Sequence, residues 1–155
     1  MRKAVRIGQP LLYLSLLVVS GDAQSQSKTP QEIRESITKA GGPERYLEAV
    51  GAASAKKVGQ MVDAETELVS VSVAGLVISG VYRLPNVTNA DLPNLAGARA
   101  VSALKSAEKV CVAPYASVLI NDFGAIYKYA YFSSNQQYLF GFQLDRSTCA
   151  PGYRW

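Results

Sequence analysis

Apolar side chains recur every three or four residues in the first part of the chain. Thr29-Pro30-Gln31-Glu32 combines an N-cap residue, a proline at the first helical position and a glutamate three residues after the cap, and Ile33 and Ile37 follow one turn apart. This pattern predicts a helix that begins at Pro30 and ends at Gly41-Gly42. The next apolar stripe predicts a second helix from Pro43 to about Val62, with an inward face of Leu47, Val50, Ser54, Val58 and Met61.

After Asp63 the apolar period changes from helical to two. Valines alternate with serines up to Ala74-Gly75, a turn signal, and the same spacing returns as far as Leu84, so residues 66–84 predict a β-hairpin. Residues 125–132 and 137–145 predict a second hairpin around the turn Ser133 to Gln136. Its strands place aromatic residues on one face, namely Tyr127, Tyr129, Tyr131, Tyr138, Phe140 and Phe142.

Two helices are predicted between the hairpins. Asn94 can cap the first, whose apolar stripe comprises Leu95, Ala98, Val101, Leu104, Ala107 and Cys111. A shorter helix follows Pro114 and stops at Gly124. The order is therefore ααββααββ. It predicts an α+β fold in which an antiparallel four-stranded sheet, built from two hairpins, has the helices packed on one face.

The first residues have the features of an export signal. Arg2, Lys3 and Arg6 precede an apolar run over residues 10–19, and this run is too short for a membrane-spanning helix. Gly21 and Ala23 fit the small positions of a cleavage site. We therefore expect a signal peptide over 1–23, a polar leader over 24–28 and a single domain over 29–155. No cysteine follows the apolar run, so we expect a periplasmic or secreted chain without a stable membrane anchor.

Charge and cysteine content narrow the function classes. The 155 residues carry a net charge of +4, and removal of residues 1–23 takes away three bases and one acid, which leaves +2. A nucleic-acid-binding protein would show a basic stripe, and Lys56-Lys57 is the only basic doublet of the domain. In an oxidising compartment the even pair Cys111 and Cys149 predicts a structural disulfide.

Part of the chain resembles a group of small exported bacterial proteins that share one disulfide and a tyrosine-alternating strand. The resemblance covers residues about 60–155. It is carried by residues 61–68, Tyr82-Arg83-Leu84, Cys111, Pro114, Leu119-Ile120, Gly124, Tyr127, Tyr129, Tyr131, Phe140 and Cys149. It implies the fold and the export, and it implies no particular activity. The Asp-Gly turn expected in that group between the last strands is replaced here by Ser133-Ser134-Asn135-Gln136.

The sequence offers little for catalysis. Without histidine there is no Ser-His-Asp triad, no Cys-His pair and no His-ligated zinc site. The acidic residues Asp63, Glu65 and Glu67 lack the further ligands of a calcium loop and are typical of a solvated face. Ser102 and Lys105 match a Ser-x-x-Lys spacing that is weak by itself. We expect a protein that is not an enzyme and that uses no metal and no cofactor.

The tyrosine-alternating strand is the strongest candidate for binding. Tyr127, Tyr129 and Tyr131 form either one wall of the core or an exposed aromatic surface, and the core interpretation is slightly favoured. Lys128 and Phe132, on the opposite face, complete the candidate binding surface. A pocket between sheet and helices is the second candidate, lined by Tyr82, Tyr127, Phe140 and Phe142.

These observations favour a non-enzymatic periplasmic module that binds another protein. It would be an immunity protein against a cell-wall-targeting toxin, or an accessory subunit of envelope or secretion machinery. The alternative is a small-molecule or lipid-binding envelope module that uses the candidate pocket. A third hypothesis is a histidine-free hydrolase that uses carboxylates such as Asp63.

Overall fold

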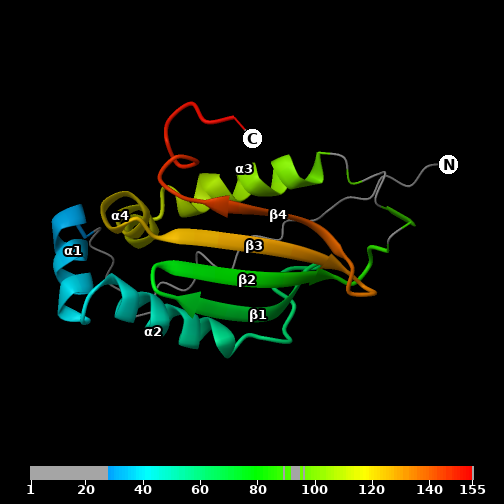
Figure 1. Ribbon diagram of the computed structural model, residues 1–155, viewed down its shortest axis with the longest axis horizontal. Helices are drawn as coiled ribbons and strands as arrows, with labels where there is room; N and C mark the ends of the chain where they lie inside the picture. Colours follow the sequence, from blue (N-terminus) through cyan, green and yellow to red (C-terminus); the bar gives the residue numbers. More distant parts are fainter. Residues whose placement is uncertain (1–27, 89, 92–94, 96, 155) are drawn as a thin grey trace.

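The predicted order of helices and strands is confirmed by the fold (Figure 1). The computed structural model describes residues 28–154 apart from 89, 92–94 and 96. The predicted signal peptide, the leader up to residue 27 and the Asn94 cap therefore lie outside the described residues. The elements are α1 (Pro30–Lys39), α2 (Pro43–Ala55), β1 (Glu67–Ala74), β2 (Val77–Leu84), α3 (Ala98–Val110), α4 (Pro114–Phe123), β3 (Ile126–Ser133) and β4 (Tyr138–Leu144).

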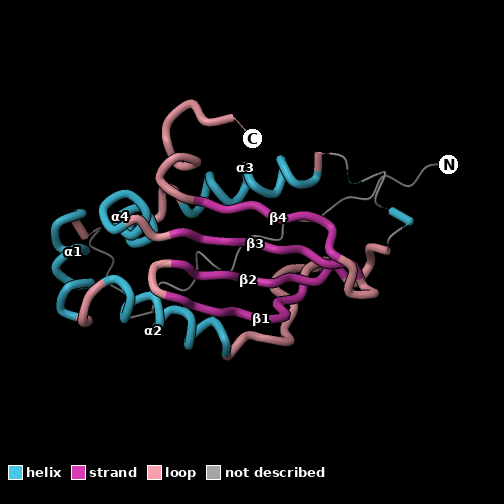
Figure 2. The backbone as a smooth tube through the Cα atoms, in the orientation of Figure 1, coloured by secondary structure: helices cyan, strands magenta, loops and turns pink. Residues whose placement is uncertain are grey.

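The four strands form one mixed sheet in the order β1-β2-β3-β4 (Figure 2). Both predicted hairpins are present, since β1 pairs antiparallel with β2 and β3 pairs antiparallel with β4. The prediction of a purely antiparallel sheet is wrong, because β2 and β3 pair in parallel from Val77 and Ile126 to Leu84 and Ser133.

The physical reason is the long connection between the hairpins. Parallel neighbours need a crossover of a dozen or more residues, and the segment 85–125 with α3 and α4 supplies one. It returns the chain to the end of the sheet where β2 began. There the Ile126 N–H donates to the Leu76 carbonyl at 2.9 Å. The sequence pattern identified both helices but not that together they form a crossover.

The first two helices differ in how well their ends were predicted. Thr29 and Glu32 form the expected capping box at the start of α1. The second helix ends at Ala55 and not near Val62, because Gly59 takes a left-handed conformation (φ 80°) and its N–H donates to the Leu68 carbonyl. The chain from Gly59 onward therefore pairs with β1, and Val58 and Met61 are exposed.

The helix α2 is continuous through Gly51. A Cβ atom at this position would lie 2.4 Å from the Val73 Cγ2 atom of β1, so only glycine lets the helix approach the strand this closely. The glycine that weakens the helix locally is the one that lets it pack on the sheet.

The helix α3 is rotated relative to its predicted orientation. It buries Ser102, Ala103 and Ser106, while Val101 and Leu104 are 53% and 49% exposed. The buried Ser106 hydroxyl donates to the Ser102 carbonyl one turn earlier, so its burial leaves no unpaired donor. Small side chains on the inward face allow a close approach to the large rings of the sheet.

The sheet has one buried face and one open face. Tyrosine and phenylalanine rings fill the buried face, called here the inner face, and the alternate residues form the outer face. Figure 1 shows α2 along the β1 edge, α3 along the β4 edge, and α1 and α4 at one end. The helices thus close the inner face from its sides, which refines the prediction that they pack on one face.

The predicted disulfide is present. Cys111, at the end of α3, is bonded to Cys149, just beyond β4, and their Cα atoms are 5.4 Å apart. The bond therefore ties the α3 crossover helix to the last strand. On the chain-entropy model, a loop of this length contributes about 4 kcal/mol to stability. Among the described residues, no helix combines the length and hydrophobicity that a membrane span requires.

Candidate functional site

The tyrosine row lies in the core. Tyr127, Tyr129 and Tyr131 are all at least 95% buried on the inner face, so the core interpretation is the one that the structure supports. The part of the candidate binding surface outside the core is thereby reduced to exposed Lys128 and half-buried Phe132 on the outer face.

The residues of the second candidate pocket also belong to the core. Tyr82 and Phe140 both stack on Tyr131, with ring centroids 5.2 and 4.7 Å away, and Phe142 stacks on Tyr129 at 4.7 Å. Such near-parallel rings fill the inner face by packing on one another. The hollow described below is on the other side of the sheet.

The catalytic candidates do not converge. Asp63 accepts a hydrogen bond from the Glu65 N–H at 2.8 Å, and burial raises the pKa of its carboxyl. Glu67 instead forms an ion pair with Arg83 on the neighbouring strand. Ser102 is buried in α3, whereas Lys105 is half-buried. The spacings seen in the sequence therefore produce no cluster of reactive groups.

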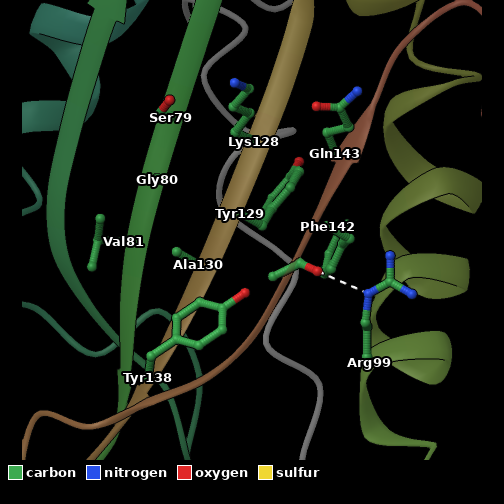
Figure 3. A pocket seen from close by; sticks show the side chains of 11 residues that line it. Ser79, Gly80, Val81, Arg99, Lys128, Tyr129, Ala130, Tyr138, Phe142 and Gln143 are labelled. Atoms are coloured by element: carbon green, nitrogen blue, oxygen red, sulfur yellow. Dashed lines mark hydrogen bonds between the residues drawn. The ribbon is translucent and has the colours of Figure 1, made fainter.

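A hollow of about 530 Å³, called here the trough, crosses the outer face of the sheet (Figure 3). Its floor is a row of small residues that face one another on three strands, Val81, Ala130 and Gly141. The next row, Ser79, Lys128 and Gln143, forms one side. The trough exists because the outer face has small side chains at the positions between the large inner rings.

Arg99 and Tyr138 form the other boundary of the trough. The Arg99 Nε–H of α3 donates to the Gly141 carbonyl of β4 at 2.9 Å, and this bond fixes the guanidinium at the sheet edge. Tyr138 is 59% exposed, and its hydroxyl lies over Gly141, 2.9 Å from the position that a Cβ atom would take there. A side chain at position 141 would therefore fill the trough.

The trough continues into a second hollow of about 300 Å³ around Phe132 and Arg83, with Val81 common to both. The Phe132 ring meets the Tyr138 ring edge to face, with centroids 5.7 Å apart. Together the hollows offer an apolar aromatic wall beside polar groups, which is the composition of many binding sites.

The charged groups near the trough are unequally paired. Arg83 is paired with Glu67. Asp145, beyond the end of β4, accepts hydrogen bonds from the Ser147 hydroxyl, Gln143 and the Thr148 N–H, which lower its pKa to about 2. Among the described residues, Lys128 and Arg99 form no ion pair with an acidic side chain. The trough is therefore rich in donors and positively charged.

The sequence pattern places Lys128 and Phe132 on this face but does not indicate Arg99 or Gly141. Its placement of Tyr138 on one face with Phe140 and Phe142 is wrong, because the β3–β4 ladder shifts register between Tyr131 and Phe132. Arg99 lies 42 residues before Gly141, and no local pattern reveals that α3 runs beside β4. The sequence signal for the trough is the alternation of small residues with aromatic ones in both β3 and β4.

Comparisons with known proteins identify a fold and no family. No family model matches the chain, and no curated protein matches it. A Pseudomonas aeruginosa protein designated as secreted has a similar structure (TM-score 0.57, 14% identity, 70% of this chain and 93% of that chain). So has the type II secretion system pilotin AspS from Vibrio cholerae (TM-score 0.50, 10% identity, 77% and 97%). The Vibrio vulnificus pilotin EpsS has a TM-score of 0.47 at 11% identity, with 78% of this chain and 98% of that chain covered.

Proposed function

We propose that this protein is a non-enzymatic accessory subunit of bacterial envelope or secretion machinery, and that it acts by binding another protein on the outer face of its sheet. The observation that carries the proposal is the trough. It joins two hollows, an aromatic wall and two cations on the outer face, where the described residues supply neither an acidic partner for the cations nor a covering helix.

Two further points support the accessory-subunit version. The fold is similar to that of AspS, which is named as a pilotin of a type II secretion system. The carboxylate and Ser-x-x-Lys candidates for catalysis do not converge. No comparable observation favours the immunity-protein version. The lipid or small-molecule version relied on Tyr82, Tyr127, Phe140 and Phe142, which are packed in the core.

Co-purification from the periplasm tests the proposal. A tagged chain, expressed together with its neighbouring genes, should recover a defined partner in a fixed ratio. Ala130→Arg should abolish this recovery, because a long side chain on the floor fills the trough. Leu104→Arg is the matched control, since it places the same side chain on the exposed side of α3 and should retain the partner.

Two results would overturn the proposal. One is recovery of the wild-type chain only as a free monomer. The other is retention of the partner by Ala130→Arg at the wild-type level. Circular dichroism of each variant establishes that it is folded before binding is compared.

A further inference from the structure

Arg99 and Lys128 give the trough a positive charge that no acidic side chain of the described residues neutralises. Arg99 and Lys128 are both exposed, and among the described residues neither has an acidic partner. The nearby acids are already engaged, since Glu67 holds Arg83 and Asp145 accepts several hydrogen bonds within its own turn. A ligand of opposite charge would therefore find two available cations and no competing carboxylate in the trough.

Arg99 is oriented before any ligand arrives. Its Nε–H donates to the Gly141 carbonyl, which aligns the planar guanidinium with the β4 edge, and none of the described residues accepts a hydrogen bond from the terminal N–H groups. A guanidinium fork matches a carboxylate in two parallel hydrogen bonds. Because the bond to Gly141 already restricts the side chain, less conformational entropy is lost when a carboxylate binds.

Lys128 is placed to reach the same ligand from the other side. It pairs across the sheet with Gln143, two residues along β4 from Gly141, and two residues of a strand span roughly 7 Å. Both cations line the same hollow. Ala130, two residues from Lys128 on β3, pairs with Gly141, whose carbonyl accepts the Arg99 hydrogen bond. The Tyr138 ring, packed against Phe132, supplies an apolar contact beside the charged groups.

We infer that the trough binds an acidic peptide segment of a partner protein, in which a carboxylate contacts Arg99 and Lys128 while a neighbouring apolar side chain packs on Ala130 and Tyr138. The inference depends on the proposed function for the identity of the partner as a protein. A peptide is favoured over an anionic polysaccharide because the aromatic wall and the apolar floor match an apolar side chain beside the acid.

Three synthetic hexapeptides of leucine alternating with glutamate, glutamine or lysine serve as probes. Their binding is followed by amide shift changes in the isotope-labelled protein. The glutamate peptide should shift the amides of Ala130, Gly141 and Gln143, bind at least tenfold more tightly than the glutamine peptide, and weaken as salt rises. The lysine peptide should not bind.

Charge removal with a matched control tests the site. Arg99→Gln combined with Lys128→Gln should weaken the glutamate peptide at least tenfold and leave the glutamine peptide unchanged. Lys105→Gln combined with Lys109→Gln removes two positive charges from α3 residues that do not line the trough, and should change neither. Equal weakening by both double variants would overturn the inference, since it would indicate attraction by net charge alone.

The remaining outcomes separate this inference from the proposed function. Glutamate and glutamine peptides that bind the trough equally would overturn the acidic preference and leave a protein-binding site. Binding of polygalacturonate in the trough without binding of any peptide would overturn the inference in favour of a glycan ligand. Loss of the periplasmic partner in Ala130→Arg tests the proposed function independently of the peptides.

Discussion

The two faces of the sheet are built from alternate residues of the same strands and have opposite properties. On the inner face Tyr129 and Tyr131 stack on the phenylalanines of β4. Directly between them on the outer face, Ala130 pairs with Gly141 and leaves a hollow. The backbone is common to both faces. Side-chain volume at alternating positions therefore decides which face closes into a core and which remains available to a partner.

The largest expected difference between the faces is the response to alkaline pH. Burial raises the pKa of Tyr82, Tyr127, Tyr129 and Tyr131 well above the usual value of 10. Above pH 10 the unfolded chain loses these protons and the folded chain retains them, so stability is full below pH 10 and falls as pH rises. Together the four tyrosines lower the free energy of unfolding by roughly 5 kcal/mol for each pH unit above pH 10.

Tyrosinate absorbance and circular dichroism, recorded together from pH 9 to 13, measure this effect. The buried tyrosines should ionise in one step that coincides with loss of the fold. A gradual ionisation of all tyrosines near pH 10, with the circular dichroism still native, would show that the inner face is open to water.

Truncating one ring on each face gives the next largest contrast. Tyr131 is fully buried and stacks on three other rings, so Tyr131→Ala should lower the free energy of unfolding by about 3–5 kcal/mol. Tyr138 is 59% exposed on the outer face, and Tyr138→Ala should cost less than about 1 kcal/mol. Urea denaturation midpoints compare the two, and equal losses would contradict the assignment of the faces.

Adding a side chain on the floor of the trough should have an intermediate effect on the free energy of unfolding. A Cβ atom at Gly141 would lie 2.7 Å from the Tyr129 carbonyl oxygen, a backbone atom that cannot move aside without disturbing the ladder. Gly141→Ala should therefore cost about 1–3 kcal/mol, as overpacking does, and weaken binding of the glutamate peptide. Ser79→Ala, in the adjacent row, is the control and should change stability by less than about 0.5 kcal/mol in the same urea experiment. An unchanged midpoint in Gly141→Ala would show that the strands separate easily.

Local patterns in the sequence predicted the elements well and the contacts between distant elements poorly. The capping box at Thr29 and the turn at Gly75 depend on neighbours in the chain, and both are present. The predicted orientation of α3 is wrong, because its apolar stripe through Val101 and Leu104 is half exposed and does not face the core. In fact Ser102 and Ser106 face it, since small side chains fit beside the large rings and bond to their own helix.

The candidate site was predictable only in part for a related reason. Lys128 and Phe132 could be placed opposite the tyrosines by alternation alone. Alternation does not tell whether the tyrosines or the residues between them face solvent, because this depends on which face of the sheet the helices enclose. That choice of face follows from the crossover between β2 and β3. The contribution of Arg99 depended on the same long-range arrangement, because α3 is part of that crossover.

The smallest expected effect is a gain in stability and not a loss, and it tests how the buried hydroxyls of the inner face are satisfied. The hydroxyls of Tyr129 and Tyr131 are buried, and no hydrogen-bond partner for either lies within the described residues. An unpaired buried hydroxyl costs free energy that its removal recovers. Tyr129→Phe and Tyr131→Phe should each raise the free energy of unfolding by about 1 kcal/mol and shift alkaline unfolding to higher pH, because one fewer buried phenol has to ionise.

Tyr138→Phe is the matched control for these two substitutions, since the hydroxyl it removes lies on the outer face, and it should leave the urea midpoint within about 0.5 kcal/mol of wild type. A loss of stability in Tyr131→Phe would mean that this hydroxyl has a partner in solution, such as an ordered water. The sign of this one substitution therefore distinguishes a dry inner face, held together by ring packing alone, from one that encloses water.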